Sequence, residues 1–311
     1  MKSKSKEKIM VLFIIFAFSF FISIRLNFKS VEMNTDISEN ETLNISDISG
    51  KIHINNNWSD AKIAGKCTGY GNSTHPYVIE DLIIDAENIG NCILIENTND
   101  YFIIENCTLY NSDDTYIITH AGITLINVTN GVITNNTLYD NFDGIYLNSS
   151  TNDIIIGNII YNSINADIEL LYSGGNIIYL NSFQSTHIDI FYLYSINTYS
   201  SQKKLIYTYN GKNHTNFLGN YWEGYSGLDE DDDGIGDSPH TIVPFEPGPG
   251  KSVLTDNYPL IEPLSNYKII GFAEESPGAI PGYNSFLFIG LISITIIFFL
   301  KSTKKGLKLK F

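Results

Sequence analysis

The stretch DEDDDGIGD near the C-terminal end has the residue types and spacing of a calcium loop. Asp229, Asp231 and Asp233 alternate, and the next residue, Gly234, suits the sharp turn that such a loop needs. An EF-hand-type loop places oxygen ligands at positions 1, 3, 5, 7 and 9 with glycine at position 6. Positions 7 and 9 are then the backbone carbonyl of Ile235 and the carboxylate of Asp237. The spacing predicts a structural Ca²⁺ site, whereas the simpler alternative is a solvated acidic turn.

The second half of this loop departs from the pattern. Position 12, which is normally a bidentate glutamate, is His240. The remaining oxygen must therefore come from Glu230, from Asp256 or from water. We expect a modest affinity, in the range of about 10⁻⁴ to 10⁻³ M that extracellular calcium modules show.

A second group of carboxylates could do acid–base chemistry. Asp167 and Asp189 lie 22 residues apart in equivalent sequence contexts, with Glu169 close by. If the two contexts are neighbouring strands, the backbones lie about 4.8 Å apart. Paired carboxylates can split their pKa values and act on a glycosidic bond. The alternative is that each aspartate simply opens a strand from a turn, and no Arg or Lys nearby adds a further catalytic group.

A third candidate is a row of aromatic side chains. Tyr110, Tyr139 and Tyr161 recur at one position of three similar segments. An aromatic ring combines an apolar face with a polar tip, so the row could bind sugar rings. Tyrosine is also a good strand residue that packs on its cross-strand neighbour, which is the structural alternative.

Copper binding is disfavoured, because a copper site needs clustered His, Cys or Met. The three methionines all lie within the first 33 residues, and the histidines are scattered: His53, His75, His120, His187, His214 and His240. Cys67, Cys92 and Cys107 lack C-x-x-C spacing. In an exported protein two of them could form a disulfide, and the odd number leaves at least one unpaired within the chain.

The charge distribution excludes nucleic acid as a partner. The chain has a net charge of −15, but 11 of its 19 basic residues lie in residues 1–29 and 286–311. The 8 basic and 33 acidic residues between these ends give that part a charge of about −25. Such a surface repels phosphate backbones and attracts cations.

Both ends of the chain resemble membrane segments. Lysines precede the apolar run 9–24 in the order of an export signal, which could be cleaved or kept as an anchor. The uncharged run 286–300 precedes five lysines, which place that end in the cytoplasm. The alternative is a sorting signal, removed after IPGYN. The part between is then extracellular and carries nine N-x-S/T sequons, which suit a glycoprotein: Asn40, Asn44, Asn57, Asn72, Asn106, Asn127, Asn135, Asn148 and Asn213.

An internal repeat sets the fold that must position these residues. Segments such as DGIYLNS align on Ile123, Ile145, Ile168 and Ile190, at steps of 22, 23 and 22 residues. Each unit holds short runs rich in Ile, Val, Thr and Tyr between Asn, Asp, Gly and Ser. A unit of this size cannot bury its apolar face alone and must stack on its neighbours. The pattern predicts an all-β protein, a right-handed parallel β-helix.

Strand alternation predicts the core and one polar ladder. Ile145 and Leu147 should point inward and Tyr146 outward, because neighbouring strand residues face opposite ways. A second inward column should comprise Ile104, Ile133, Ile155 and Ile178. Asn136, Asn158, Asn181 and Asn220 recur at one turn position, where their amides can bond along the stack, and Cys107 takes that position in an earlier coil.

The coils, the opening GYGNSTHPYVIEDLIID and the closing GNYWEGYSGLDEDDDGIGDSP … DNYPL resemble the NosD-like β-helix surface proteins of prokaryotes, especially archaea. The resemblance covers roughly residues 50–262. It implies a right-handed parallel β-helix and either copper binding or carbohydrate binding and sugar hydrolysis, without fixing a reaction.

We expect seven segments: a signal (1–29), a linker (30–50), the β-helix (51–222), a cap with the calcium loop (223–262), a stalk (263–285), a transmembrane or sorting segment (286–301) and a basic tail (302–311). The function expected is that of a cell-surface module, anchored by its C-terminal segment, which binds an extracellular glycan or acts in adhesion. The competing class is a polysaccharide lyase or glycoside hydrolase that uses Asp167, Asp189 and Glu169.

Overall fold

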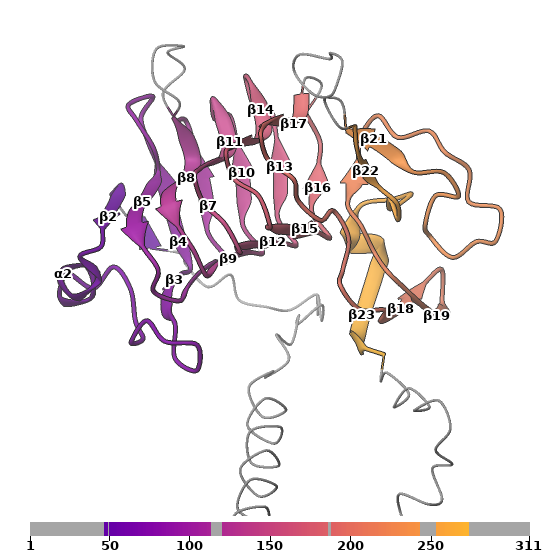
Figure 1. The fold of residues 1–311 in the computed structure, drawn as a ribbon, viewed down its shortest axis with the longest axis horizontal. Coiled ribbons are helices and arrows are strands. Elements are labelled where there is room, and N and C mark those ends of the chain that lie inside the picture. The colour runs from indigo at the N-terminus through magenta and orange to yellow at the C-terminus, as the bar shows by residue number, and fades with distance from the viewer. Residues whose placement is uncertain (1–46, 49, 113–119, 186–187, 243–252, 274–311) are drawn as a thin grey trace, which may run out of the picture. The chain divides into compact units, whose positions relative to one another are not determined.

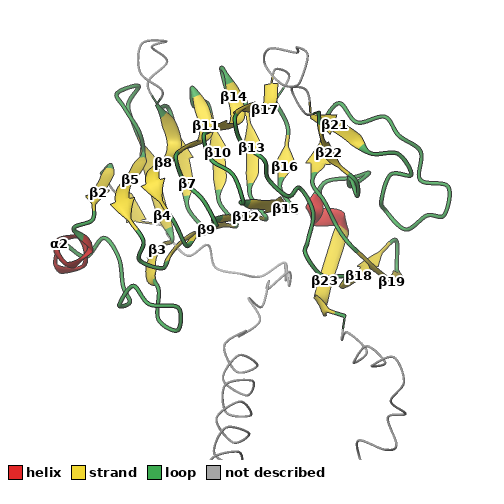
Figure 2. Ribbon diagram, in the orientation of Figure 1, coloured by secondary structure: helices red, strands yellow, loops and turns green. Residues whose placement is uncertain are grey.

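The structure is a computed structural model that describes residues 47–48, 50–112, 120–185, 188–242 and 253–273. The expected signal, transmembrane or sorting segment and basic tail lie outside these residues, as do most of the linker and the second half of the stalk. Almost all regular structure in the described residues is strand, and the elements are arranged as stacked sheets (Figures 1 and 2).

Three parallel sheets form the walls of a β-helix, which confirms the predicted fold class. The six-stranded sheet comprises β2 (Ile52–Asn55), β5 (Ile93–Thr98), β8 (Ala121–Val128), β11 (Asp143–Asn148), β14 (Ala166–Leu171) and β17 (Ile188–Leu193). The seven-stranded sheet comprises β1 (Asp47–Ile48), β4 (Leu82–Asp85), β7 (Thr108–Tyr110), β10 (Thr137–Tyr139), β13 (Ile159–Tyr161), β16 (Ser182–Phe183) and β20 (Tyr221–Trp222). The five-stranded sheet comprises β3 (Tyr77–Glu80), β6 (Phe102–Glu105), β9 (Gly131–Thr134), β12 (Ile154–Ile156) and β15 (Ile177–Tyr179).

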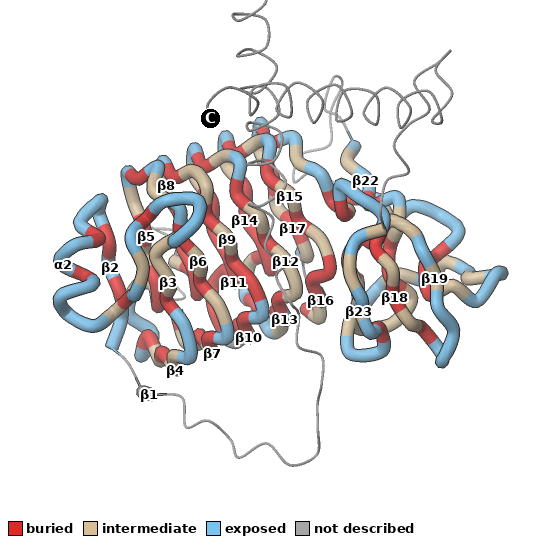
Figure 3. Tube along the Cα trace, turned by 90° about the horizontal axis from the view of Figure 1, so that it is seen from below, coloured by how far each residue is buried: buried red, intermediate tan, exposed pale blue. Residues whose placement is uncertain are grey.

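The predicted register of the coils is confirmed. Ile145 pairs with Ile123 on one side and with Ile168 on the other, and Ile168 pairs with Ile190. All four side chains are buried, and the second isoleucine column is paired and buried in the same way. Figure 3 shows buried residues recurring in coil after coil. These columns remove a continuous aliphatic surface from water, which is the main stabilising contribution to such a fold.

The alternation holds, but the outer face of the six-stranded sheet is less open than expected. Tyr146 retains only 6% of its exposure and Thr124 only 1%. A charge at Tyr146 would therefore be costly, although sequence alternation alone suggests a tolerant surface position.

The asparagine side chains form a hydrogen-bond ladder inside one corner. The backbone N–H of each residue donates to the side-chain oxygen of its counterpart one coil later, at 3.0 to 3.1 Å, in the order Asn136, Asn158, Asn181 and Asn220. Cys107 stands at the start, where its N–H donates to Asn136 Oδ1 at 2.9 Å. The amides also donate to backbone carbonyls, so turn groups that are shut off from water keep partners.

Two further inner ladders follow the same rule. In one of them, the backbone N–H of a residue donates to the serine hydroxyl of the next coil: Val128 to Ser150, Ser150 to Ser173 and Ser173 to Ser195. The other runs from Gly131 through Asp153 and Asn176 to Asn197. Their steps of 21 to 23 residues are visible in the sequence.

Each end of the stack has its own elements. At the N-terminal end α2 (Trp58–Ile63) lies beside β2, and its Trp58 stacks on Tyr77 at 4.7 Å between ring centroids (Figure 1). At the C-terminal end β21 (His240–Ile242) pairs with β22 (Leu254–Asp256).

The C-terminal region contains a three-stranded sheet outside the β-helix. Two of its strands, β18 (Leu205–Tyr209) and β19 (Lys212–Asn216), form a β-hairpin. The expected stalk begins with η1 (Leu264–Asn266) and β23 (Tyr267–Phe272), and β23 pairs with β18. Strands β18, β19 and β23 thus form one three-stranded sheet from distant segments of the chain. Its buried side chains include Tyr207 and Tyr209 of β18 and Tyr267 of β23.

Candidate functional site

The three tyrosines of the predicted row lie in register on the outer face of the seven-stranded sheet. Tyr139 pairs with Tyr110 in the preceding coil and with Tyr161 in the next. Their rings stack with centroids 4.9 and 5.2 Å apart and planes within 8° of parallel. Both faces of the Tyr139 ring are therefore covered, and the row offers ring edges and phenolic hydroxyls rather than open ring faces.

A cavity of about 480 Å³ lies at the C-terminal end of this tyrosine row. Ile160 pairs with Phe183 in the adjacent strand. Tyr161 follows Ile160 and Gln184 follows Phe183, so Gln184 continues the tyrosine column. On the β-helix side the cavity is lined by residues 157–159, Ser182 and Gln184, and on the other side by Thr208, Asn210, Gly211 and residues 263–268. The volume is within the range of about 300 to 1,000 Å³ of small-molecule sites. Sequence reasoning missed this cavity because its two walls come from segments far apart in the chain.

Of the predicted carboxylates, Asp167 and Asp189 do stand opposite each other in β14 and β17. Asp167, however, is completely buried and accepts a hydrogen bond from the Ser185 hydroxyl. Burial raises its pKa to about 7 and raises that of Asp189 to about 6. A buried carboxyl bound to a serine inside a corner cannot reach a polysaccharide, which favours the structural role of Asp167.

Glu169 has a different carboxyl neighbour, Asp143, which the sequence did not single out. The Asn165 amide donates to Asp143 Oδ1 at 2.9 Å and to Glu169 Oε2 at 3.0 Å. Burial and then the charge of Glu169 raise the pKa of Asp143 well above its usual range, and burial raises the pKa of Glu169. The Asn165 amide thus bridges the two carboxyl groups, and each group influences the pKa of the other. Asp143 is completely buried and Glu169 is 7% exposed, so a polysaccharide cannot reach this pair.

The acidic loop brings three of its five predicted ligands together. Carboxylate oxygens of Asp229, Asp231 and Asp233 lie within 4.8 Å of one another. Asp229 accepts the backbone N–H groups of Asp233 and Gly234 at 3.0 and 2.9 Å. Gly234 has a φ of +87°, which a side-chain-bearing residue adopts only with strain. These bonds fold the loop around its own carboxylates.

The three-stranded sheet holds this loop in place. The Tyr207 hydroxyl donates to the Asp233 carbonyl at 2.9 Å, and the Tyr267 hydroxyl donates to the Gly234 carbonyl. The Asn216 amide reaches Asp233 Oδ2 at 3.3 Å. Burial is the largest cause that raises the pKa of Asp233, and the other loop carboxylates add to it. A bound cation would relieve that repulsion.

The other residues considered for the loop have different partners. Asp237 accepts the N–H of Glu230, and Ile235 lies buried opposite Leu260. His240, at position 12, stacks on Trp222 with 4.4 Å between ring centroids. Asp256 is not available as the missing ligand, because it is buried and accepts hydrogen bonds from Asn220 and Trp222.

Trp222, which precedes the acidic loop in the sequence, belongs to the β-helix core. Trp222 is almost completely buried and packs on Phe183 of the preceding coil, with 4.7 Å between ring centroids. Trp222 thus closes the β-helix core, while the acidic loop that follows it lies against the three-stranded sheet.

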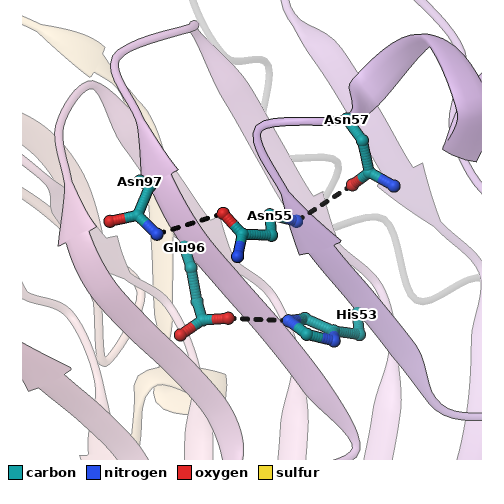
Figure 4. Close-up of polar contacts among 5 residues, drawn as sticks. All are labelled: His53, Asn55, Asn57, Glu96 and Asn97. Atoms are coloured by element: carbon teal, nitrogen blue, oxygen red, sulfur yellow. Dashed lines mark hydrogen bonds and ion pairs between the residues drawn. The ribbon is translucent and has the colours of Figure 1, made fainter.

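The described donors that copper would prefer are dispersed. The three cysteines are free and buried, and burial raises the pKa of Cys92 to about 12 and of Cys107 to about 11. His53 contacts Glu96, with Nε2 and Oε2 2.7 Å apart, beside the Asn55–Asn97 amide contact (Figure 4). Among described residues, the aspartates of the acidic loop are the metal-ligating group that geometry brings together.

No helix within the described ranges is long and apolar enough to cross a membrane. The two apolar runs on which the predicted anchoring depends lie outside those ranges.

Comparison with known proteins gives one family and one distant structure. The solved complex of XylC with xylose shares 18% sequence identity with this chain at a TM-score of 0.33. It matches 55% of this chain but only 30% of its own, a likeness too low to support an inference. Curated proteins gave no significant match. The family model described as periplasmic copper-binding protein (NosD) matches residues 27–227, more than half of the chain. With its stacked parallel coils, the chain belongs to the NosD family.

Proposed function

We propose that this protein is an exported β-helix module that binds an extracellular glycan along the outer face of its seven-stranded sheet. The observation that carries the proposal is the column of Tyr110, Tyr139 and Tyr161, which Gln184 extends into the cavity. Hydroxyl, amide and aromatic groups in one line suit a chain of sugar rings. The alternative role of the row, stacking that stabilises the sheet, predicts no effect of the hydroxyls on binding.

The contact with sugar uses the edges of the rings. Because neighbours cover both faces of Tyr139, a sugar cannot lie flat on that ring. Each phenolic hydroxyl can instead donate and accept a hydrogen bond at the spacing of the coils, about 5 Å. A repeating polymer laid along the β-helix axis would meet such a row more than once.

We also propose a structural Ca²⁺ at Asp229, Asp231 and Asp233. The oxygen donors and the cluster of three carboxylates support it. The ion would stabilise the loop against β18 and β23, where Tyr207 and Tyr267 hold its backbone. Copper, the metal in the family's description, is not proposed, since soft and imidazole donors do not converge in the described residues.

For the location of the protein, we propose export with the C-terminal segment as anchor. The description of the family as periplasmic supports export, and the sequence of residues 286–311 supports the anchor. Hydrolysis or lysis by carboxylates remains the competing function. The burial of Asp143, Asp167 and Glu169 counts against it.

A glycan array run beside a reducing-sugar release assay tests the proposal. We expect binding without release, and at least a tenfold loss of affinity in a Tyr139→Phe, Tyr161→Phe double variant. Tyr194→Phe is the matched control, because Tyr194 is 76% exposed and lies outside the row. Unchanged binding in the double variant would exclude the tyrosine row, and release that requires Glu169 would establish the enzyme instead.

A further inference from the structure

We propose that Asn72 is a modification site, at which the side-chain amide nitrogen carries an N-linked glycan. The modification needs the exported location proposed above, and it does not depend on whether the protein itself binds a glycan. The sequence contains nine N-x-S/T sequons, and the motif alone does not distinguish among them. Asn40 and Asn44 lie outside the described residues, and the structure places the other seven in very different surroundings.

Four of these seven sequons belong to the turns of the coils, where the fold itself accounts for the asparagine. Three of them have φ values of +52° to +54°, a left-handed conformation that asparagine adopts more readily than most residues: Asn106, Asn127 and Asn135. The residue that follows each of these three is buried in the coil: Cys107, Val128 and Asn136. In the fourth sequon, that of Asn148, the serine is Ser150, which is buried in the serine ladder. A modifying enzyme therefore meets only part of each motif.

The amide nitrogen is also engaged in three of these turns. Nδ2 donates to a neighbouring side chain in each case: Asn106 to Asp81, Asn127 to Asn97 and Asn148 to Tyr146. Glycosylation replaces a hydrogen of this nitrogen by a bulky sugar, which must then fit beside the next coil, about 4.8 Å away. The coil turns thus use their sequon asparagines to hold the fold together.

The sequon of Asn72 has the opposite surroundings. It lies in the connection between α2 and β3, outside the three parallel sheets (Figure 1). Its three residues, Asn72, Ser73 and Thr74, are all exposed. The backbone groups of Asn72 and His75 hydrogen-bond to each other at 3.3 and 3.1 Å, so the motif forms a tight surface turn. A surface loop of an exported protein is the context in which a sequon serves as a glycan acceptor.

The turn uses the oxygen of the Asn72 amide and leaves the nitrogen. Oδ1 accepts the backbone N–H groups of Thr74 and His75 at 3.1 and 3.0 Å, and it accepts the Thr74 hydroxyl at 2.8 Å. None of the hydrogen bonds of Asn72 with described residues involves Nδ2. A role in the turn alone therefore explains the oxygen, whereas the nitrogen, which is the atom that glycosylation modifies, has no competing contact there.

The two remaining sequons are held by regular structure. Asn57 directly precedes α2, and the next residue, Trp58, is 2% exposed and stacks on Tyr77. Asn213 lies within β19, which pairs with β18 along its length. Presenting either motif to an enzyme would require opening the N-terminal end of the stack or breaking a strand pair. The turn at Asn72 belongs to none of the helices or sheets and needs no such change.

The modification forms one bond and breaks one. Nδ2 of Asn72 attacks the anomeric carbon of a sugar that is joined through phosphate to a lipid carrier, and the bond from that carbon to the phosphate oxygen breaks. The nitrogen loses one proton to a base of the transferase, and the carrier phosphate leaves as an anion. Oδ1 is unchanged, so the turn keeps its three hydrogen bonds in the product.

Mass spectrometry of the full-length protein from the cells that naturally produce it tests the assignment. Combined cleavage after lysine and glutamate separates the sequons: residues 52–62 contain Asn57, residues 67–80 contain Asn72 and residues 213–223 contain Asn213. Residues 106–169 contain the four sequons of the coil turns. We expect the mass of a glycan on peptide 67–80 and the plain sequence mass for the other three peptides.

Three variants produced in the same cells show that the glycan is on Asn72. Asn72→Asp keeps the oxygen that the turn uses and removes the nitrogen, so the glycan mass should disappear while the turn remains. Thr74→Ala should also abolish it, because the hydroxyl completes the sequon. Ser73→Ala is the matched control, since it changes an exposed residue of the same turn and keeps the sequon. The glycan mass should persist in this control.

The remaining outcomes would contradict the proposal. A plain mass for peptide 67–80 in the wild-type protein would overturn the assignment to Asn72. A modification that survives in Asn72→Asp or in Thr74→Ala would not be a sequon-directed N-linked glycan at this residue. A glycan on peptide 106–169 would show that hydrogen bonds and burial in the coil turns do not prevent modification, which would remove the structural basis of the choice.

Discussion

Asp256 Oδ2 accepts the backbone N–H of Asn220 at 2.7 Å, so a carboxylate from β22 ends the asparagine ladder that begins at Cys107. The same oxygen accepts the Trp222 indole N–H at 3.0 Å. Asp256 Oδ1 accepts the N–H of Tyr258. One residue, 36 positions away from Asn220, thereby completes the hydrogen bonds of the last coil.

Replacement of Asp256 should unfold the C-terminal end first. Asp256→Ala leaves several buried donors unpaired, each costing about 1 to 3 kcal/mol, so we expect a loss of about 3 kcal/mol or more. Urea unfolding followed by Trp fluorescence measures it. Asp256→Asn keeps one acceptor oxygen and should cost less. Equal effects of the two variants would contradict the ladder-end role.

Gly219 offers an independent check on this contact. A Cβ at Gly219 would lie 2.0 Å from Asp256 Oδ1, so even alanine forces the carboxylate or the backbone to move. We expect Gly219→Ala to destabilise the protein by more than 1 kcal/mol. Gly224 has open space around its Cβ position and serves as the control. An unchanged free energy of unfolding in Gly219→Ala would show that the Asp256 carboxylate can move away, which would contradict a position fixed by its hydrogen bonds.

Asp153→Asn should stabilise the protein at pH 8. Asp153 Oδ1 accepts the Gly131 N–H at 2.7 Å, whereas its buried Oδ2 has no hydrogen-bond partner. Burial raises the Asp153 pKa to about 7, so charge accumulates in the interior above that pH. Asparagine is already used by Asn176 and Asn197 in the same ladder. We expect a gain of about 1 to 2 kcal/mol at pH 8 that shrinks as the pH falls and disappears below about pH 4. A gain independent of pH would rule out removal of charge as its cause.

The stability of the protein should fall as pH rises. The folded-state pKa values of Asp153 and Asp167 are about 7 and those of Asp189 and Asp256 about 6, all above the usual 3.8 of aspartate. Between pH 4 and pH 7 the folded state thus holds protons that the unfolded chain has released. The contribution is complete below about pH 4 and is lost as pH passes through 6 to 7. Melting temperatures from pH 4.5 to 8 measure it, and an Asp153→Asn, Asp167→Asn variant should flatten the slope. Stability that rises over this range would contradict these shifts.

Calcium should raise the melting temperature of the metal-free protein. With an affinity of about 10⁻⁴ to 10⁻³ M, 5 mM Ca²⁺ adds about 1 to 2 kcal/mol of stability. Asp231→Asn with Asp233→Asn should abolish the response. Asp232→Asn is the matched control, because Asp232 has a φ of +56° that asparagine accepts and is not part of the carboxylate cluster. A flat titration to 5 mM, or a response that survives the double variant, would exclude the site.

The sequence by itself determined the coils and what they stack. A period of 22 to 23 residues fixes which residues become neighbours, because parallel strands repeat their pairing once per coil. Ile145 and Asn158 were therefore assignable to an apolar column and to a ladder before any coordinates. The Asp229 to Asp233 spacing was equally readable, because its contacts are local along the chain.

Only the tertiary structure decided which side chains meet at the corners of the coils and which distant segments pack together. Glu169 shares the Asn165 amide with Asp143, whereas Asp167 accepts a hydrogen bond from Ser185. Strand alternation could not predict these partners, because a residue at the start of a strand can turn either into a corner or onto the outer face. The pairing of β18 with β23, the cavity that contains Lys268 and the role of Asp256 each join segments tens of residues apart without a repeat between them. No period specifies such contacts, since they form only when the end of the β-helix packs against the chain that follows it.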